Sequence, residues 1–346
     1  MPFEALNVGL IGAGRIGRVH ARNLTHFIPT ANIGVVADER LDAAQQCAHE
    51  NRIAHAVADY HAVLDDPTVD AVMICSSTHT HAHIIEEAAQ AGKHIFCEKP
   101  IALSLPVIDT ALAEVERAGV KLQIGFNRRF DPNFRRVRDA IVGGEVGQPH
   151  LLHIISRDPS PPPIEYVKVS GGIFLDMTIH DFDMARFLIG TEVEEVYTAG
   201  GVMVDPAIGA AGDLDTALVV LKFANGVVGT IDNSRQATYG YDQRVEVFGS
   251  GGAIRTDNDY PNNALLSDAH SVRRDLPLHF FMERYTASFV NEITAFVDAI
   301  ANDRPTPVTG ADGRAPVVMG LAARRSYDEG RPVRLAEVDT LLAPRG

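Results

Sequence analysis

The pattern of apolar and polar positions divides the chain into two halves of different character. From residue 1 to about 125, short apolar runs alternate with segments whose apolar positions recur every three or four residues. This alternation predicts parallel strands joined by helices through right-handed crossovers, with a ligand bound beyond the carboxyl ends of the strands. The expected strands are 6–11, 33–37, 69–75, 94–97 and 120–125, and the expected helices are 16–24, 42–51, 81–91 and 105–118.

After about residue 150 the apolar positions alternate in steps of two along longer segments. Asn225-Gly226 and the glycine-rich stretch 249–252 are turn signals between these segments. The pattern is typical of an antiparallel meander that carries a few helices. The expected strands are 151–156, 194–204, 216–223, 227–232, 245–248 and 331–335, and the expected helices are 283–302 and 311–329.

Glycines mark the turn after the first predicted strand. Gly12-x-Gly14-x-x-Gly17 lies between that strand and the first helix, and Asp38 ends the next apolar run. This is the dinucleotide-binding fingerprint: a strand, a tight turn, a helix, a second strand and an acidic residue. In this motif the N-terminus of the helix presents backbone amides to the phosphates of the cofactor. Asp38 favours NAD, since its carboxylate binds a ribose hydroxyl and repels a 2′-phosphate, whereas Arg40 leaves NADP open.

The expected fold class is therefore α/β with two domains. An N-terminal Rossmann domain with a parallel sheet is expected at residues 1–125. A C-terminal α/β domain with a large open, mostly antiparallel sheet is expected at residues 126–346, for substrate binding and oligomerisation.

Composition excludes several classes of protein. The 346 residues are 46% apolar and 22% charged, as in ordinary globular proteins, and no apolar run approaches the ~20 residues of a membrane helix. The formal net charge of −14 argues against a nucleic-acid partner. Cys47, Cys75 and Cys97 lie in apolar or helical surroundings, which favours reduced core thiols in a cytoplasmic protein. No basic region precedes the first apolar segment, which is itself a predicted strand, so no signal peptide is expected.

Two further clusters carry candidate chemistry. Lys99, in Glu98-Lys99-Pro100, follows a predicted strand at the cofactor end of the sheet, where an ammonium group stabilises developing negative charge on oxygen. The alternative is a solvated lysine before a helix. Asp176, His180 and Asp183 are spaced by four and three, so a helix places them on one stripe, and a histidine beside a carboxylate is a suitable general base.

The second cluster also has a structural interpretation. Asp176 or Thr178 could be the N-cap of a helix with a core histidine behind it. The preceding Gly171-Gly172 favours a functional site, because glycines allow close approach of backbone to a ligand.

The histidines at 79, 81 and 83 alternate, as metal ligands on one face of a strand would. They precede a helical pattern, however, and no carboxylate or cysteine nearby in the sequence completes a tetrahedral ligand set. We therefore expect no metal, and expect this segment to line the cofactor site. The arginines between 128 and 138 are interpreted as a partly solvated helix face, because the chain is acidic and lacks interleaved aromatic residues there.

Together, the glycine fingerprint, the Glu98-Lys99-Pro100 motif and the 171–183 cluster resemble the Gfo/Idh/MocA family of oxidoreductases over nearly the whole chain. Segments 125–131, 239–249 and 280–285 narrow the resemblance to its inositol dehydrogenases. The resemblance implies a Lys–Asp–His catalytic set, which falls on Lys99, Asp176 and His180. Asp158 departs from the asparagine that is usual in this branch.

The implied binding residues form two groups. The cofactor residues are Gly12, Gly14, Arg15, Ile16, Gly17, Asp38, Ser76, Thr78, His79, Glu98 and Lys99. The substrate residues are Lys99, Arg128, Asp158, Asp176, His180, Asp183, Tyr239 and Tyr241.

The resemblance implies NAD-dependent oxidation of a cyclitol, with myo-inositol as substrate and scyllo-inosose as product. Another inositol isomer or a hexopyranose remains an alternative substrate. A non-catalytic NAD-binding regulator is an alternative of another class. Because an open sheet has one face to bury, we also expect a homo-oligomer, which the resemblance makes a tetramer.

Overall fold

The computed structural model describes residues 5–342 and divides the chain into two compact units. The first unit comprises Met1–Phe130 and Ala287–Ala315, and the second comprises Asp131–Thr286 and Pro316–Gly346. The sequence-based division at 125/126 differs in two respects, because it leaves residues 126–130 and residues 287–315 with the second domain. The second difference is the larger one. The physical reason is that helix α12 (Thr286–Ala301) packs its apolar side chains into the core of the first unit.

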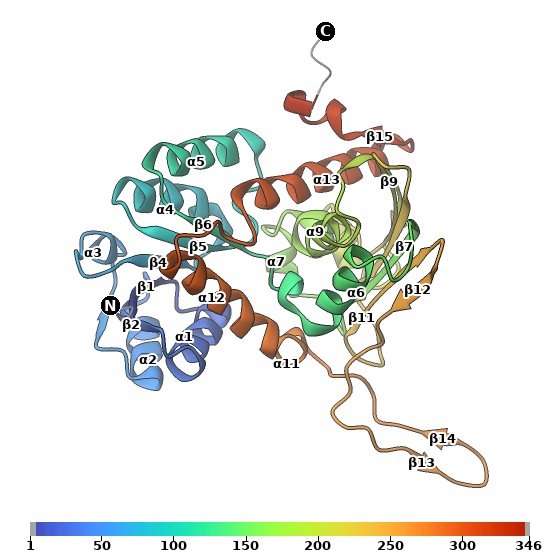
Figure 1. Ribbon diagram of the computed structural model, residues 1–346, viewed down its shortest axis with the longest axis horizontal. Helices are drawn as coiled ribbons and strands as arrows, with labels where there is room; N and C mark the ends of the chain where they lie inside the picture. Colours follow the sequence, from blue (N-terminus) through green and yellow to red (C-terminus); the bar gives the residue numbers. More distant parts are fainter. Residues whose placement is uncertain (1–4, 343–346) are drawn as a thin grey trace. The chain divides into compact units, whose positions relative to one another are not determined.

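The first unit contains a six-stranded sheet in the order β3-β2-β1-β4-β5-β6, and every pairing is parallel (Figure 1). The predicted parallel α/β sheet is thus confirmed. Its strands are β1 (Leu6–Ile11), β2 (Ala31–Ala37), β3 (His55–Val57), β4 (Ala71–Ile74), β5 (His94–Glu98) and β6 (Leu122–Gly125). Its helices are α1 (Arg15–Phe27), α2 (Leu41–Asn51), α3 (His61–Leu64), α4 (Thr78–Gln90), α5 (Leu105–Ala118) and η1 (Asn127–Phe130).

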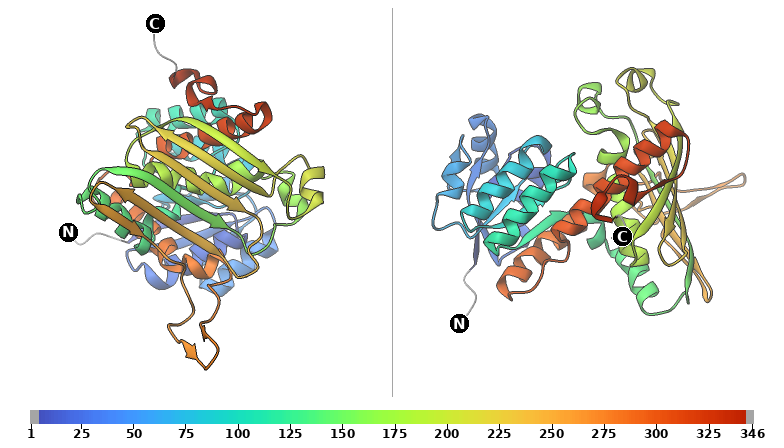
Figure 2. Two further views of the ribbon diagram at one scale, coloured as in Figure 1. Left: turned by 90° about the vertical axis from the view of Figure 1, so that its right-hand side faces the viewer. Right: turned by 90° about the horizontal axis from the view of Figure 1, so that it is seen from above.

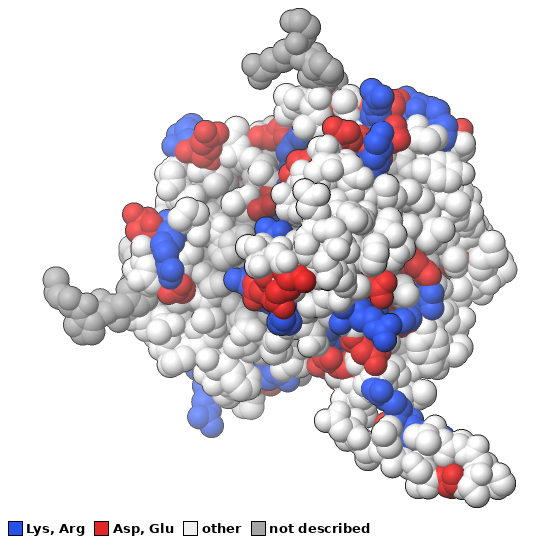
Figure 3. Space-filling view, turned by 45° about the vertical axis from the view of Figure 1, so that its right-hand side comes forward, with Lys and Arg blue, Asp and Glu red and all other residues white. Residues whose placement is uncertain are grey.

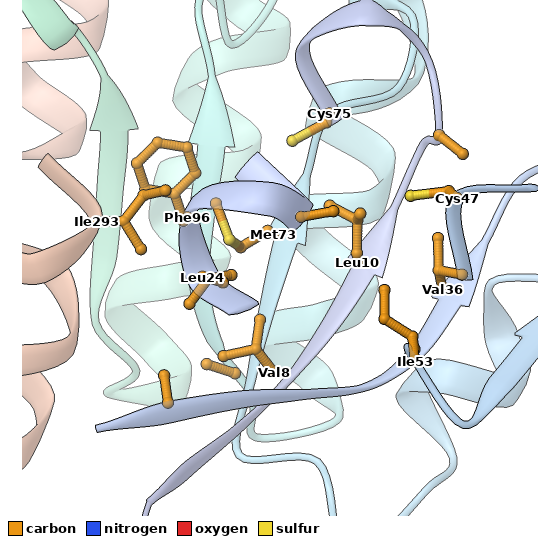
Figure 4. Packing of buried hydrophobic residues seen from close by; sticks show 14 of the residues in the cluster. Val8, Leu10, Leu24, Val36, Cys47, Ile53, Met73, Cys75, Phe96 and Ile293 are labelled. Atoms are coloured by element: carbon orange, nitrogen blue, oxygen red, sulfur yellow. The ribbon is translucent and has the colours of Figure 1, made fainter. Parts of the chain in front are cut away.

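A continuous apolar core lies between this sheet and its helices. Leu10 of β1, Met73 of β4 and Phe96 of β5 are completely buried, and Leu24 of α1 and Ile293 of α12 pack against them (Figure 4). The strand order reverses between β1 and β4, so the carboxyl ends of these two strands form the crevice where nucleotides bind in such sheets.

The second unit contains a seven-stranded sheet in the order β12-β11-β7-β10-β9-β8-β15. Its strands are β7 (Pro149–Arg157), β8 (Val193–Gly201), β9 (Thr216–Phe223), β10 (Val228–Ser234), β11 (Asp242–Gly249), β12 (Gly252–Arg255) and β15 (Val333–Arg334). The large, mostly antiparallel sheet is confirmed, but the simple meander is wrong at β7. This strand lies between β10 and β11 and not beside β8, and it runs parallel to β10. The chain reaches β10 only after α9, β8 and β9, and this long crossover permits the parallel pairing.

Helices cover one face of this sheet, and within the second unit no described helix covers the other face (Figure 2). The helices are α6 (Pro132–Val142), α7 (Ile164–Val167), α8 (Gly172–Asp176), α9 (Thr178–Ile189), α10 (Pro206–Ala210), α11 (Phe281–Arg284), α13 (Gly310–Glu329), η2 (Leu335–Glu337) and η3 (Thr340–Leu342). The expected helix 283–302 is interrupted at Tyr285, where α11 ends and α12 follows. No helix within residues 5–342 is both long and apolar enough to cross a membrane.

A hairpin of β13 (Leu266–Ser267) and β14 (Val272–Arg273) extends from the second unit (Figure 1). Every residue from 261 to 276 in this segment, which we call the arm, is exposed. It carries the charged residues Asp268, Arg273, Arg274 and Asp275, and the face shown in Figure 3 is otherwise uncharged. Its large exposed apolar side chains are Leu265, Leu266, Val272 and Leu276.

Candidate active site

The glycine turn after β1 has the geometry that its sequence predicts. Gly12 has φ +99°, and a Cβ there would lie 2.6 Å from the backbone of Cys75. A Cβ on Gly17 would lie 1.9 Å from the Gly12 carbonyl oxygen, so only glycine allows α1 to begin this close to the strand. At Gly14 nothing lies within 4 Å of a Cβ, and this open backbone at the start of α1 leaves room for a pyrophosphate.

Asp38 follows β2 at the same edge of the sheet. Its two carboxylate oxygens accept hydrogen bonds from the amides of Ala13, at 2.7 Å, and Arg40, at 3.0 Å. The acid is therefore fixed beside the glycine turn, as binding of an adenosine ribose requires. Of the neighbouring cofactor candidates, Arg15 is exposed and Ile16 packs on the core.

The loop after β4 forms the other wall of this crevice. The hydroxyls of Ser76 and Thr80 are hydrogen-bonded at 2.7 Å, and α4 begins at Thr78 with His79 exposed. The three alternating histidines are helical, so they do not share a face: His81 is buried, whereas His83 is exposed. His79 and Thr78 remain cofactor candidates by position.

The strand end that carries Lys99 is held on both sides. His20 Nε2 lies 2.7 Å from Glu98 Oε1, and His81 Nδ1 lies 2.8 Å from the Pro100 carbonyl oxygen. The other ring nitrogen of His81 contacts the Ser76 carbonyl oxygen at 3.0 Å, so this side chain ties the loop after β4 to the loop after β5. Burial lowers the pKa of His81, although both backbone contacts oppose that shift.

The second unit builds an acidic cluster around one buried arginine. Arg235 is 3% exposed and follows β10. Its guanidinium lies 3.0 Å from Asp176 Oδ2 and 3.5 Å from Asp158 Oδ2. The Tyr166 hydroxyl donates to Asp176 Oδ1 at 2.8 Å. Burial opposes charge on Arg235, but Asp176 and Asp158 outweigh it and raise its pKa.

The parallel pairing of β7 and β10 explains why these residues meet. Both strands end at one edge of the sheet, so Asp158 and Arg235 emerge together, and the Asp158 amide donates to the Ser234 carbonyl at 2.9 Å. Tyr239 and Asp242 lie at the same edge, where β11 begins, and the Tyr239 hydroxyl donates to Asp242 at 2.6 Å.

The helix carrying Asp176 and His180 is divided. Asp176 ends α8, Met177 has φ −97° and ψ −62°, and α9 begins at Thr178, so the expected single helical stripe is wrong at this point. Neither Asp176 nor Thr178 is the N-cap; Met177 occupies that position. Thr178 instead donates to the buried Asn233 of β10 at 2.6 Å.

Asn233 fixes the helix that carries the histidine. Its amide nitrogen donates to Asp181 Oδ2 at 2.9 Å and to the Ser156 carbonyl at 3.2 Å. The first turns of α9, with His180 among them, are thereby bound to β7 and β10.

The two glycines before α8 have a structural reason for being glycine. Gly171 and Gly172 have φ +87° and +78°, which side-chain-bearing residues rarely adopt. A Cβ on Gly172 would lie 2.7 Å from Asp213 Oδ1, and that oxygen accepts the Ile173 amide at 3.0 Å. The expected close approach of backbone is thus to Asp213.

The remaining substrate candidates lie in different settings. Arg128 and Arg129 are 5% and 8% exposed in η1, so the interpretation of their segment as a solvated face is wrong at these two residues. Asp183 is fully buried on α9. Tyr241 packs edge-on against Tyr285 at 6.0 Å, while the Tyr239 hydroxyl also accepts from Arg157 at 3.1 Å.

Sequence reasoning missed Arg235, Asn233 and Tyr166. The first two follow an apolar run at 227–232, and polar residues at the end of a predicted strand were a usable signal. Tyr166 lies in a short helix after a proline-rich segment, and no local pattern distinguishes it.

Two family models match most of this chain. Residues 6–126 match the model of an oxidoreductase family with an NAD-binding Rossmann fold, and residues 134–255 match a GFO/IDH/MocA C-terminal domain.

Individual relatives match along almost the full length. A myo-inositol 2-dehydrogenase of Thermotoga maritima is 48% identical over 96% of this chain and 99% of its own. An inositol 2-dehydrogenase of Rhizobium meliloti is 46% identical over 95% and 98%. The crystal structure of a myo-inositol dehydrogenase from Corynebacterium glutamicum has a TM-score of 0.92, at 37% identity, over 98% and 99%.

Proposed function

We propose that this chain oxidises a secondary alcohol of inositol with NAD, because it belongs to the Gfo/Idh/MocA family of oxidoreductases. The product expected from myo-inositol is scyllo-inosose. The proposal depends on one observation above all: Asp176 ends a short helix four residues before His180. Its carboxylate is fixed by Arg235 and Tyr166, as an imidazole-orienting carboxylate must be.

The residues of the first unit fit NAD. The open backbone at Gly14 and the start of α1 suit the pyrophosphate, and the fixed carboxylate of Asp38 suits the ribose hydroxyls. Bound NAD supplies the hydride acceptor. Ser76, Thr78, His79 and Glu98 lie at the same edge and complete the expected cofactor set.

Each catalytic residue has a separate role. His180 takes the proton of the reacting hydroxyl. Asp176 orients the imidazole and stabilises its charged form, and the bonds from Arg235 and Tyr166 prevent this carboxylate from turning away. Lys99 stabilises the negative charge that develops on the substrate oxygen. Joint action of Lys99 with His180 on one carbon is part of the proposal.

A cyclitol presents a hydroxyl on every carbon, and each unpaired buried hydroxyl costs ~1–3 kcal/mol. Arg128, Asp158, Asp183 and Tyr241 or Tyr239 are the residues proposed to meet these groups. The Asp158 carboxylate is already oriented by Arg235, so it is suited to accept hydrogen bonds from substrate hydroxyls.

Initial rates of NADH formation test the function. The purified chain is assayed with myo-inositol, scyllo-inositol and a set of aldohexoses, each with NAD and with NADP. The highest kcat/KM is expected with myo-inositol and NAD. A preference for scyllo-inositol or an aldose would overturn the substrate assignment, and tight NAD binding without turnover of any polyol would indicate a regulator.

The bare face of the seven-stranded sheet supports self-association into a tetramer. By strand register, Phe248, Leu151 and Val228 lie side by side on it, and Tyr197 and Leu218 continue the same face. All five are between 39% and 47% exposed. Polar residues such as Lys222 and Glu246 lie among them on this face, and exposed apolar side chains with polar neighbours are typical of an interface. Light scattering is expected to give four chains per particle; a monomer at micromolar concentration would contradict this.

A cytoplasmic location belongs to the same proposal. Cys47, Cys75 and Cys97 are buried and free of disulfides, as is usual in a reducing compartment.

A further inference from the structure

A polar cluster lies inside the apolar core of the first unit. His20 of α1 and Glu292 of α12 are 0% exposed, and Glu98 ends β5. A side-chain ligand atom of each of the three lies within 4.8 Å of the other two. Phe96 and Phe289 enclose the His20 ring edge-on, with centroids 5.3 and 5.7 Å away. Glu98 alone reaches the surface, where its side chain is 12% exposed.

The cluster contains polar atoms that the described residues do not satisfy. Both oxygens of Glu292 and the Nδ1 atom of His20 are buried without a partner there. The same holds for the amide group of Asn23, one turn along α1, and for Gln123 Oε1, whose own Nε2 donates to the Glu292 carbonyl. Buried polar atoms nearly always have a hydrogen-bond partner, and an internal water supplies it where the protein does not.

The charge balance of the cluster restricts its protonation. Two carboxylates a few ångströms apart in apolar surroundings cannot both stay ionised without compensation. Burial raises the pKa of Glu292 well above its usual range, and the charge of Glu98 raises it further. Among residues 5–342 no lysine or arginine forms an ion pair with Glu292.

The other titratable groups facing the cluster do not change this balance. They are Cys97 beside Glu98 on β5 and Cys75 after β4, and burial raises the pKa of both thiols well above the usual value. Both are therefore neutral. Among the described residues, the basic side chain of this cluster is His20, which contacts the Glu98 carboxyl at 2.7 Å and lies within 4.8 Å of the Glu292 carboxyl.

We propose that His20, Glu98 and Glu292 form a buried proton-holding site. In this site Glu292 is a carboxylic acid joined through internal water to the Glu98–His20 pair, and the site fixes the strand end that carries Lys99. The last part rests on the proposed function, whereas the protonation of Glu292 does not.

The geometry at the end of β5 supports the positioning role. Glu98 pairs with Gly125 in the sheet, and a Cβ on Gly125 would lie 3.1 Å from the Glu98 carboxyl carbon and Oε2. The Glu98 side chain thus lies against bare backbone and is held by His20. Since His81 holds Pro100, Lys99 is flanked by two residues whose positions are each fixed by a histidine. Glu98 and His20 are positioning residues in this proposal.

Infrared difference spectroscopy tests the proton directly. The spectrum of the full chain at mildly alkaline pH is compared with that of Glu292→Gln. A carbonyl stretch of a protonated carboxyl is expected in the original chain and not in the variant. Glu116→Gln, the same change at an exposed position of α5, should leave the band in place. Absence of the band, or its survival in Glu292→Gln, would overturn the proposal, as would a stoichiometric divalent cation found by elemental analysis.

Stability against pH gives an independent measurement. A carboxyl whose pKa is raised in the folded state contributes stability that is lost as pH rises above the unfolded pKa. Glu292→Gln removes this loss, so its melting temperature relative to the original chain should rise from mildly acidic to alkaline pH. A constant difference across that range would contradict a buried protonated Glu292.

Kinetics test the link to Lys99. His20→Phe keeps the ring contacts but removes the bond to Glu98, and His20→Gln keeps a donor. We expect kcat to fall on the order of 10- to 100-fold in His20→Phe, with KM for NAD little changed, and to recover in His20→Gln. Equal kcat in all three chains would remove the positioning role. Lack of inositol turnover in the original chain would instead defeat the proposed function and leave the infrared result standing.

Discussion

The carboxylate of Asp38 accepts a hydrogen bond from the backbone amide of Ala13 at 2.7 Å, so the end of β2 is tied to the glycine turn after β1. The residue expected to recognise the adenosine ribose is thereby fixed by the turn expected to hold the phosphates. The Asp38 side chain is therefore expected both to favour NAD over NADP and to hold the glycine turn in place.

Asp38→Asn separates the two roles. The amide oxygen of asparagine can still accept the Ala13 amide, but the negative charge is lost. We expect kcat/KM for NAD to fall roughly 10- to 100-fold, since bonds to charged groups contribute ~1.5–3 kcal/mol, and the ratio of NADP to NAD activity to rise. Steady-state rates with both cofactors measure this. Asp42→Asn, exposed in the first turn of α2, is the control, and an unchanged cofactor ratio in Asp38→Asn would exclude the role.

Two glycines of one motif should respond differently to the same substitution. Gly17→Ala places a Cβ 1.9 Å from the Gly12 carbonyl oxygen, so we expect a loss of about 1–3 kcal/mol in unfolding free energy. Gly14→Ala meets nothing within 4 Å, so stability should hold while KM for NAD rises. Denaturant unfolding and cofactor titration distinguish the two. Equal destabilisation by both variants would contradict the assigned roles.

The sequence allowed prediction of those features whose cause is local. The glycine turn, the acid at Asp38 and the lysine after β5 each follow from a short motif next to a recognisable strand. Both sheets were predicted for the same reason, because apolar periodicity reports burial along a single segment.

Features that depend on pairing between distant segments could not be predicted. Arg235 meets Asp158 only because β10 runs parallel to β7, and no local pattern specifies this pairing. The packing of α12 into the first unit could not be predicted either. Its apolar stripe predicts that the helix is buried, but not which of the two cores it joins. The interruption of the helix at Met177 was not predicted either, because the spacing of Asp176, His180 and Asp183 by four and three fits an unbroken helix equally well.

Loss of Arg235 should affect both stability and substrate binding. Arg235→Met keeps much of the volume but removes the buried cation beside Asp158 and Asp176. Removing one partner of a buried ion pair costs about 3–5 kcal/mol, and the freed carboxylates should raise KM for inositol more than KM for NAD. Urea unfolding and initial rates measure the two effects. Arg273→Met on the exposed arm is the control, and a variant as stable as that control would refute the structural role.

The environment of Asp215 should make the unfolding free energy of the protein depend on pH. Its buried carboxylate accepts the amides of Met203, Val204 and Asp205 at 2.7 to 2.9 Å. Burial works against the charge, but these bonds outweigh it and lower the pKa of Asp215. A carboxyl with a lowered folded-state pKa contributes stability above its unfolded pKa and loses it as pH falls.

Asp215→Asn should therefore reduce the unfolding free energy by about 1–3 kcal/mol at neutral pH, because asparagine cannot accept all three amides. The difference from the original chain should shrink as pH falls through the acid range. Chemical denaturation at a series of pH values measures it. A difference that grows toward acid would reverse the sign and contradict the assignment.

His180 is the proposed general base, and its replacement gives the most direct test of the chemistry. His180→Ala should lower kcat by ~10²–10⁴-fold, the usual contribution of a positioned base, and should leave NAD affinity unchanged because the cofactor residues lie in the first unit. Stopped-flow rates and NADH fluorescence titration measure the two quantities. His83→Ala, at an exposed position of α4, should have full activity. Unchanged turnover in His180→Ala would remove the imidazole from the mechanism, and weakened NAD binding would show that the substitution disturbs more than proton transfer.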